Sequence, residues 1–254
     1  MTARLHYTVA GPAGAPVMLL GPSLGTTSTM WSAQIPLLAR QFRVVAFDHR
    51  GHGESESPVG PWTIDDFGHD VVALLDDLDM PSASYAGVSL GGMVGMWLAA
   101  YLPQRIERLV VICTSAHLHA AQYWAERAAT VRKRGMQAIV DPVVGHWFTQ
   151  AFAARCDDVV WEYKQMLGSM PVQGYAAACE AIGEMDLRAD LHRISAPTLV
   201  VVGADDLAIP VENSHEIADA VHGAQLVVVR NAAHLANVEQ PEQVGQAIVE
   251  HLEA

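Results

Sequence analysis

The sequence has few cysteines and few basic residues, and both shortages exclude classes of function. Its three cysteines, Cys113, Cys156 and Cys179, are an odd number with no CxxC spacing, which argues against a disulfide framework and a zinc site. Reduced thiols in a cytoplasmic protein are the interpretation we adopt. The 15 Lys and Arg residues face 28 Asp and Glu residues, for a formal net charge of −13. Because nucleic-acid binding requires basic patches, we expect no nucleic-acid partner.

Long uninterrupted apolar runs are also missing. Although 51% of the residues are hydrophobic, no stretch approaches the roughly 20 apolar residues that a membrane helix needs. The first residues, MTARLHYTVAG, lack an apolar signal core and resemble a strand, so we expect neither export nor a membrane partner. A length of 254 residues suits one large α/β domain, or a core domain that carries an insertion.

The first half of the chain alternates short apolar runs with helical patterns. Strands are predicted at Leu5–Ala10, Val17–Gly21, Arg43–Asp48, Ala83–Val88 and Leu109–Thr114, and helices at Trp31–Ala39, Ile64–Leu78 and Leu90–Tyr101. Strands separated by helices predict a mostly parallel sheet with helices on both faces. The apolar runs are continuous rather than alternating, as is typical of buried parallel strands.

The strand signal disappears between about residue 120 and residue 187, where helical patterns rich in Ala, Met and Trp replace it. Strands resume at Thr198–Val202 and Leu226–Val229, and a final helix is predicted from Glu242. We expect residues 120–187 to form a helical cap inserted into a core made of residues 1–119 and 188–254. Such a cap would lie above the carboxyl ends of the strands, where open α/β sheets bind ligands.

A G-x-S-x-G motif at residues 87–91 marks Ser89 as a candidate nucleophile. The strand pattern SASYAGV precedes it and the helix pattern LGGMVGMWLAAYL follows it, which is the context that a nucleophile elbow requires. The serine must occupy a sharp, strained turn, and Gly87 and Gly91 leave room where strand and helix pack closely. The alternative is an ordinary glycine-rich turn, because the bare motif is common by chance.

Candidate acid and base residues follow the last two predicted strands. Asp206 lies in the segment from Gly203 to Pro210 with G-x-x-D-x-x-x-P spacing, and we prefer it over the adjacent Asp205. His234 follows the final strand and precedes the terminal helix. A serine hydroxyl needs such a base to take its proton, and the order serine, acid, histidine matches the nucleophile-elbow enzymes.

Two backbone amides are candidates for an oxyanion hole. A tetrahedral intermediate needs two N–H donors, and we predict these to be the amides of Leu90 and Leu24, the latter in the loop Gly21-Pro-Ser-Leu-Gly25. The alternative for that loop is a turn without a catalytic role.

The segment DHRGHG at residues 48–53 is interpreted as structural, with an arginine that ties loops together. His117 and His119 form an HxH without a third ligand at suitable spacing, so we expect no metal site.

The assembled motifs make the sequence resemble the 3-oxoadipate enol-lactonases of the β-ketoadipate pathway over nearly its whole length. DHRGHGES, GVSLGGMVG, GADDLAIP and AAHLANVEQPE are general hydrolase motifs, whereas SLGTTSTMW, YWAERAATV, HWFTQAF and PVQGYAAACEAI are specific to this group. The resemblance implies an α/β-hydrolase fold with an inserted helical cap. It also implies a catalytic triad and an oxyanion hole, formed by Ser89, Asp206 and His234 and by the Leu24 and Leu90 amides. One departure is Pro22, where a polar residue is expected.

The implied substrate is a small anionic enol-lactone, hydrolysed without a cofactor or metal. Its carboxylate needs a basic partner, and we select Arg127, with Trp124 three positions earlier on the same helix face as a wall of the pocket. Arg127 could instead belong to the solvated basic run at residues 132–134. Trp147 and Met166 are assigned to packing. Two alternative functions remain. The protein could be another cofactor-free hydrolase, such as a carboxylesterase, another lactonase or a perhydrolase, or it could be a scaffold of the same fold without turnover.

Overall fold

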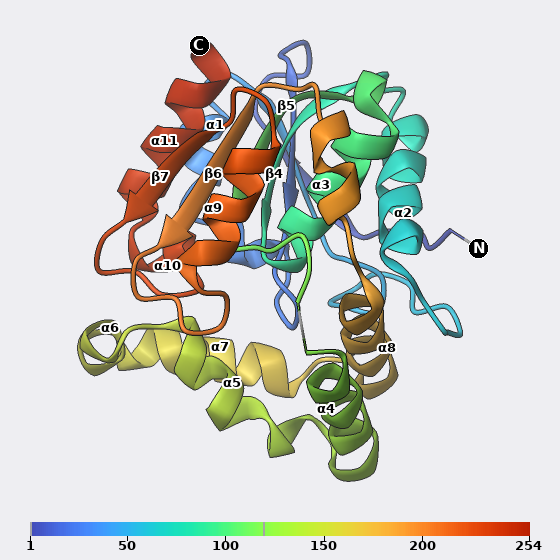
Figure 1. Cartoon of the computed structure of the whole chain (residues 1–254), viewed down its shortest axis with the longest axis vertical. Coiled ribbons are helices and arrows are strands. Elements are labelled where there is room, and N and C mark those ends of the chain that lie inside the picture. Colours follow the sequence, from blue (N-terminus) through green and yellow to red (C-terminus); the bar gives the residue numbers. More distant parts are fainter. Residues whose placement is uncertain (1, 119) are drawn as a thin grey trace.

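The computed structural model describes residues 2–118 and 120–254 of the chain (Figure 1). Within these residues seven strands form one sheet in the order β1-β3-β2-β4-β5-β6-β7. Only β1 runs antiparallel to its neighbour, β3, and every other adjacent pair is parallel. The strands are β1 (Tyr7–Ala10), β2 (Val17–Gly21), β3 (Arg43–Phe47), β4 (Ala83–Val88), β5 (Ile106–Ile112), β6 (Thr198–Gly203) and β7 (Gln225–Val229). The predicted mostly parallel sheet is confirmed.

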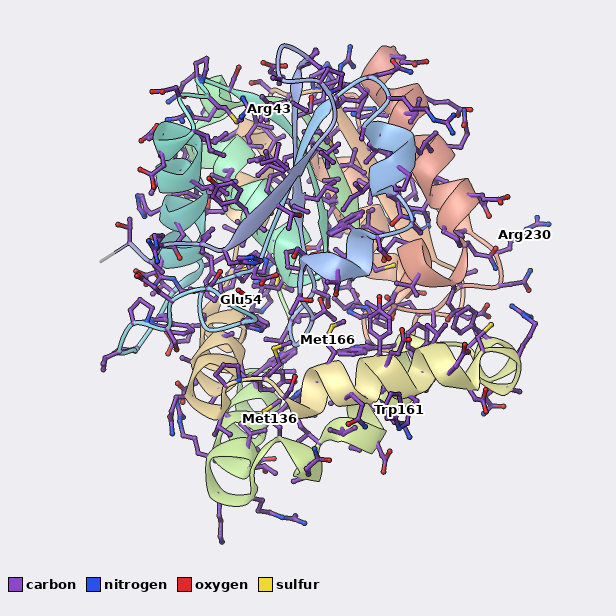
Figure 2. The ribbon with its side chains drawn as sticks, turned by 180° about the vertical axis from the view of Figure 1, so that it is seen from behind. Arg43, Glu54, Met136, Trp161, Met166 and Arg230 are labelled. Atoms are coloured by element: carbon purple, nitrogen blue, oxygen red, sulfur yellow. The ribbon has the colours of Figure 1, made fainter. Side chains whose placement is uncertain are left out.

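Helices cover both faces of this sheet. Figure 1 shows α3 and α9 in front of the strands, with α2 packed beside α3, and Figure 2 shows α1 and α11 on the opposite side. Their bounds are α1 (Ile35–Leu38), α2 (Ile64–Asp77), α3 (Leu90–Tyr101), α9 (Val211–Ala220) and α11 (Pro241–Glu253), and a short α10 (Ala236–Glu239) precedes α11. Burial of β4 and α3 is almost complete, so the connection between these two elements lies within the core.

The helix predicted at Trp31–Ala39 is wrong in part. A 3₁₀ turn covers Ser28–Trp31, and α1 begins only at Ile35. The amide of Gln34 donates to the carbonyl of Trp31 (2.9 Å), which closes a separate turn. Pro36 then stands in the first helical turn, where backbone N–H groups have no partner within the helix and the missing N–H of proline does no harm. The proline therefore starts a new helix instead of lying inside one.

Among the described residues between β5 and Thr198, where the next strand begins, there are five α-helices and two short 3₁₀ helices. The α-helices are α4 (Ala121–Arg134), α5 (Val140–Trp147), α6 (Gln150–Arg155), α7 (Asp157–Gly168) and α8 (Val172–Glu184). Figure 1 shows them together beyond the carboxyl ends of the strands. In Figure 2, Met166 points from α7 toward the sheet, whereas Trp161, which is 61% exposed, lies on the outer side. The division at residues 120 and 187 stays a prediction. No helix in the described part of the chain is long and apolar enough to cross a bilayer.

A buried ion pair fixes the loop after β3 to α2. The Arg50 Nε and Nη2 atoms donate to the two carboxylate oxygens of Asp70 (2.6 and 2.7 Å), and the two side chains are 2% and 1% exposed. Nη2 also donates to the carbonyl of Asp66 (3.0 Å). The structural role predicted for the arginine of DHRGHG is thus confirmed, because its bonds go to neighbouring backbone and to α2.

Removing one partner of this pair should destabilise the protein strongly. We expect Asp70→Asn to lower the free energy of unfolding by about 3 to 5 kcal/mol, because it removes the buried carboxylate that accepts two hydrogen bonds from the Arg50 guanidinium and leaves that cation with the more distant, partly exposed carboxylate of Asp66 (3.5 Å). Urea unfolding followed by circular dichroism measures this. The matched control is Asp76→Asn, which breaks the exposed ion pair with Arg105 and should change stability by less than about 1 kcal/mol. Equal losses in the two variants would contradict the argument.

Candidate active site

Ser89 sits on the turn between β4 and α3 in a strained backbone conformation. Its φ of 54° and ψ of −113° place a residue with a side chain in a region that proteins keep mainly at functional sites. The turn is held from below: the Ser89 amide donates to the Ile112 carbonyl (2.9 Å), and the Thr114 hydroxyl donates to the Ser89 carbonyl (2.7 Å). The side chain is therefore presented at the end of the sheet by a rigid support.

The two glycines of the motif are required by close backbone contacts. A Cβ atom on Gly87 would lie 2.2 Å from the carbonyl carbon of Gly91, and one on Gly91 would lie 2.3 Å from the carbonyl oxygen of Gly21. Neither position has space for a methyl group, since the obstructing atoms belong to the backbone. The glycine requirement predicted for the elbow has this physical origin.

His234 and Asp206 form a buried hydrogen-bonded pair. The His234 Nδ1 atom lies 2.9 Å from Asp206 Oδ2, and the residues are 4% and 6% exposed. Asp206 Oδ1 accepts the amides of Ala208 (2.8 Å) and Ile209 (2.9 Å), so the carboxylate cannot rotate freely. Because a carboxylate accepts hydrogen bonds, we assign the imidazole proton to Nδ1, which leaves Nε2 available as a base.

The neighbouring Asp205 occupies a different environment. It is exposed, and its amide donates to the carbonyl of Ala232 (2.9 Å). Asp206 alone of the two points its carboxylate at the imidazole of His234. The geometry therefore favours the preferred aspartate over its alternative.

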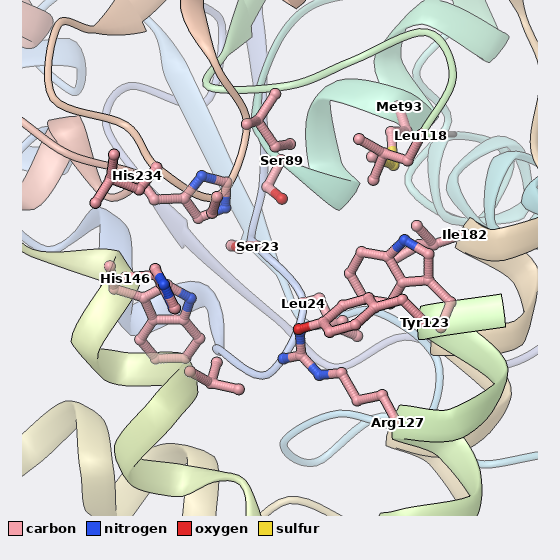
Figure 3. A pocket seen from close by; sticks show the side chains of 16 residues that line it. Ser23, Leu24, Ser89, Met93, Leu118, Tyr123, Arg127, His146, Ile182 and His234 are labelled. Carbon is pink, nitrogen blue, oxygen red and sulfur yellow. The ribbon is translucent and has the colours of Figure 1, made fainter. Parts of the chain in front are cut away.

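Ser89 and His234 open onto a cavity of about 270 Å³ (Figure 3). Its walls come from the ends of the strands on one side and from α4 and α5 on the other. In Figure 3 the Ser89 hydroxyl and the His234 ring face the space into which Arg127 and Tyr123 reach from α4. The lining residues are Ser23, Leu24, Ser89, Met93, Leu118, Tyr123, Trp124, Arg127, Val143, His146, Trp147, Ile182, Leu207, Ala208, Ile209 and His234.

Comparison with known proteins agrees with this arrangement. The family described as the alpha/beta hydrolase fold matches residues 16–241 of the chain. The chain belongs to the α/β-hydrolase family. The predicted α/β-hydrolase fold is thereby confirmed, and the elbow at Ser89 occupies the place where this family carries its nucleophile.

Individual relatives of this α/β-hydrolase include enol-lactonases. The chain is 38% identical to 3-oxoadipate enol-lactonase 2 of Acinetobacter baylyi, over 96% of this chain and 91% of that protein. It is 34% identical to 3-oxoadipate enol-lactonase 1 of the same organism, over 94% and 89%. The crystal structure of the enol-lactonase from Burkholderia xenovorans is 37% identical, covers 99% of this chain and 97% of its own, and superimposes with a TM-score of 0.97. The resemblance predicted from the sequence is confirmed.

The two predicted oxyanion donors lie at either side of the elbow of this α/β-hydrolase. Leu90 is the first residue of α3, and amides in the first turn of a helix have no partner within it. Leu24 lines the cavity from the loop after β2. α/β-Hydrolases draw their two donors from these two places, and the assignment to Leu24 and Leu90 stays a prediction.

Pro22 supports the same loop through its carbonyl. That oxygen accepts the amide of Gly91 (3.0 Å) and contacts Nε2 of His49 (3.1 Å). Burial, followed by the nearby His52, lowers the pKa of His49 to about 3, so the ring is neutral and donates from Nε2. The loop that carries Leu24 is thus fastened to the elbow by an oxygen that proline retains.

The predicted substrate-binding pair, Trp124 and Arg127, also lines the cavity. The Arg127 guanidinium donates to the hydroxyls of Tyr175 and Tyr123, and its central carbon lies 5.1 Å from the Trp124 ring and 5.4 Å from the Tyr175 ring. Its Nε is buried without a hydrogen-bond partner, and no ion pair among the described residues includes it. Arg127 therefore offers an unmatched positive charge to the cavity and does not belong to the surface run at residues 132–134.

Sequence reasoning missed several residues of the cavity wall, among them Trp147 and His146. Trp147 lines the cavity as well as packing against Tyr163, whereas the sequence predicts a packing role alone. His146 lies beside it, and its Nδ1 contacts the carbonyl of Pro142 (2.8 Å). Nothing in the sequence separates His146 from the other histidines, although the group-specific motif HWFTQAF begins there.

The HxH motif has an ordinary structural environment at its first residue. Nδ1 of His117 contacts the carbonyl of Met185 (2.9 Å), and His117 forms an isolated bridge with Asp186. His119 lies outside the described residues. Among those that are described, no group of three or more His, Cys, Asp or Glu side chains is placed to hold a metal ion.

Proposed function

We propose that this protein hydrolyses 3-oxoadipate enol-lactone to 3-oxoadipate in the breakdown of aromatic compounds, through an acyl-enzyme on Ser89. One observation carries the proposal: a single cavity contains Ser89, the imidazole of the His234–Asp206 pair and Arg127, which forms no ion pair among the described residues. Ser89 and the imidazole, oriented by Asp206, suit ester cleavage, and the arginine suits a substrate that is itself an anion. The enol-lactonase relatives support the same substrate.

Acylation uses the three triad residues in separate roles. The Ser89 oxygen attacks the ring carbonyl carbon while Nε2 of His234 takes its proton. Asp206, held by two backbone amides, keeps the imidazole oriented and stabilises its charged form. The amides of Leu24 and Leu90 would receive the negative charge on the carbonyl oxygen. Collapse of the intermediate breaks the bond to the ring oxygen, which leaves as an enolate and receives the proton from His234.

Deacylation repeats these steps with water in place of the serine. His234 removes a proton from water, the resulting hydroxide attacks the acyl carbon, and Ser89 recovers its proton as the ester bond breaks. The product enol then tautomerises to the ketone. An enolate is a stable leaving group, so ring opening itself is undemanding. Each step is a proton or acyl transfer, and none of them uses a cofactor or a metal.

We further propose that the helices of residues 120–187 act as the cap that selects the substrate, and that the enzyme works in the cytoplasm. Helices α4 and α5 supply several cavity residues: Tyr123, Trp124, Arg127, Val143, His146 and Trp147. The strand ends supply the reacting groups. In this proposal the residues at the strand ends carry out the reaction, and the residues of the cap select the substrate. The three cysteines are unpaired, which suits a reducing compartment.

Arg127 should distinguish anionic from neutral substrates. We expect Arg127→Ala to raise KM for the anionic lactone by about 10- to 100-fold, the loss of a charge-assisted contact of roughly 1.5 to 3 kcal/mol. Hydrolysis of the neutral ester p-nitrophenyl acetate should change by less than about threefold, since it offers no anion. Steady-state kinetics of the two substrates measures both effects.

The control for this substitution is Arg134→Ala. Arg134 is exposed near the end of the same helix, α4, and its loss removes an equal charge from the protein. KM for the lactone should remain unchanged in this variant. If Arg127→Ala weakens lactone and neutral ester equally, the arginine has a structural role and the carboxylate is bound elsewhere.

The proposed function is tested by supplying the enol-lactone and following the loss of its ultraviolet absorbance. Turnover well above that of Ser89→Ala is the expected result. Turnover of p-nitrophenyl acetate without turnover of the lactone would replace the proposal by a carboxylesterase, another lactonase or a perhydrolase with the same triad. Absence of turnover with either substrate would reject the serine hydrolase assignment altogether.

A further inference from the structure

A buried carboxylate, Glu239, lies close to His234 in the chain but outside the proposed triad. It ends the short helix α10 and is 5% exposed. Its Oε1 atom accepts the amides of Thr149 (2.6 Å) and Ala233 (3.4 Å), and its Oε2 accepts the hydroxyl of Thr149 (3.0 Å). Thr149 belongs to the connection between α5 and α6, whereas Ala233 directly precedes His234. One side chain thus joins the cap segment to the loop that carries the imidazole.

Burying the Glu239 carboxylate costs free energy, and its hydrogen bonds must offset that cost. Burial raises the pKa of Glu239 despite the bonds from Thr149 and Ala233, and no basic side chain among the described residues forms an ion pair with it. Its stabilisation comes from backbone and hydroxyl donors. The carboxylate therefore depends on the α5–α6 connection and the His234 loop keeping their places, and it holds each of them against the other.

A second bond reinforces the link on the other side of the imidazole. The amide of Leu235 donates to the carbonyl of Trp147 (3.0 Å), the last residue of α5. Residues on both sides of His234 are thus tied to consecutive parts of the same cap segment, one directly and one through Glu239. Trp147 itself lines the cavity. Figure 1 shows α10 at the end of the sheet that faces α5 and α6.

We propose that Glu239 is a positioning residue, which holds His234 in register with the cavity by fastening the His234 loop to the α5–α6 connection. The inference rests on the proposed function in taking His234 as the base. Glu239 is not among the described residues that line the cavity, so it acts through the imidazole and not on the substrate. A displacement of about 1 Å in a reacting group can lower a rate by about 10²-fold, and such a displacement is what the contacts of Glu239 resist.

The test compares three substitutions with p-nitrophenyl acetate as substrate. Glu239→Ala removes every contact, and we expect kcat to fall by about 10- to 100-fold with KM within about threefold of the original value. Glu239→Asp keeps the charge but is too short to reach both partners, so it should show a smaller loss in the same direction. Glu239→Gln keeps the length and the accepting Oε1, and it should restore kcat to within about threefold. Glu242→Ala, at an exposed glutamate in α11, is the control and should match the unmodified enzyme.

A spectroscopic measurement separates positioning from general loss of stability. The proton assigned to Nδ1 of His234, 2.9 Å from Asp206 Oδ2, should give a far-downfield ¹H NMR signal, and that signal should be absent from His234→Ala. We expect it to shift or broaden in Glu239→Ala and Glu239→Asp and to persist in Glu239→Gln. If Glu239→Ala does not fold, the aspartate and glutamine variants decide. An aspartate variant with unchanged kcat and an unchanged signal would overturn the proposal, as would a glutamine variant that loses both. Because neither readout uses the lactone, a failure of the lactonase assignment leaves this test intact.

Discussion

Replacing Ser89 with alanine is expected to lower kcat for both the lactone and p-nitrophenyl acetate by about 10⁴-fold or more. Without the hydroxyl no acyl-enzyme can form, and the reaction must proceed by direct attack of water. The Leu24 and Leu90 amides and the cavity would remain, which explains why some rate above the uncatalysed one should persist. The backbone strain at this position is unchanged, because alanine at a φ of 54° meets the same obstacles as serine.

The matched control for this prediction is Ser82→Ala. Ser82 lies just before the same strand, β4, and its hydroxyl donates to Glu107 at the surface. Activity should be unaffected there. Binding of the lactone to Ser89→Ala, followed by calorimetry, should also be preserved, since only the reacting atom is missing. A variant without Ser89 that retains a tenth of the activity would show that another group is the nucleophile.

Asp206→Asn should produce a loss of comparable size, about 10⁴-fold in kcat. The carboxylate accepts the Nδ1 proton of His234 and two backbone amides. An amide group must place its NH₂ toward one of these donors, and turning it away from the backbone amides points it at the imidazole. The proton then moves to Nε2, which can no longer accept a proton from Ser89. The variant should fold normally, because the side chain keeps its shape, and steady-state kinetics measures the loss.

The chain contains an ideal control for this substitution in the adjacent residue. Asp205→Asn changes the charge by the same amount one position away, at an exposed side chain. It should leave kcat within about twofold. The reverse ranking of the two variants would transfer the acid to Asp205.

The sequence predicts those parts of the site whose structure depends on neighbouring residues in the chain. The elbow at Ser89 needs a strand, two glycines and a helix in immediate succession, and each of these leaves its own pattern. The observed bounds of β4 and α3 agree with the predicted Ala83–Val88 and Leu90–Tyr101. Asp206 and His234 follow strand ends, and the carboxyl ends of parallel strands meet at one edge of a sheet. Their proximity therefore follows from the topology.

The sequence does not predict those parts of the site that depend on packing between helices far apart in the chain. The environment of Arg127 is set by Tyr175, which α8 brings against α4, and helix packing of this kind leaves no local pattern. The sequence therefore permitted a surface or a cavity position for Arg127. Glu239 is a further example. Its partner Thr149 is separated from it by 90 positions, and a glutamate near the start of a terminal helix is ordinarily solvated.

The unmatched guanidinium of Arg127 has a consequence for how the molecule meets its substrate. The protein as a whole carries a formal charge of −13, so an approaching anion is first repelled by the surface. Inside the cavity it is attracted over a short range by the Arg127 guanidinium. Dissolved salt screens charges over a Debye length of about 10 Å at 0.1 M. This weakens the repulsion by the surface far more than the attraction by Arg127 inside the cavity. If the substrate is the proposed anion, its selection is therefore expected to take place in the last few ångströms of approach. The outer surface is free to keep the negative charge that favours solubility, because recognition does not depend on it.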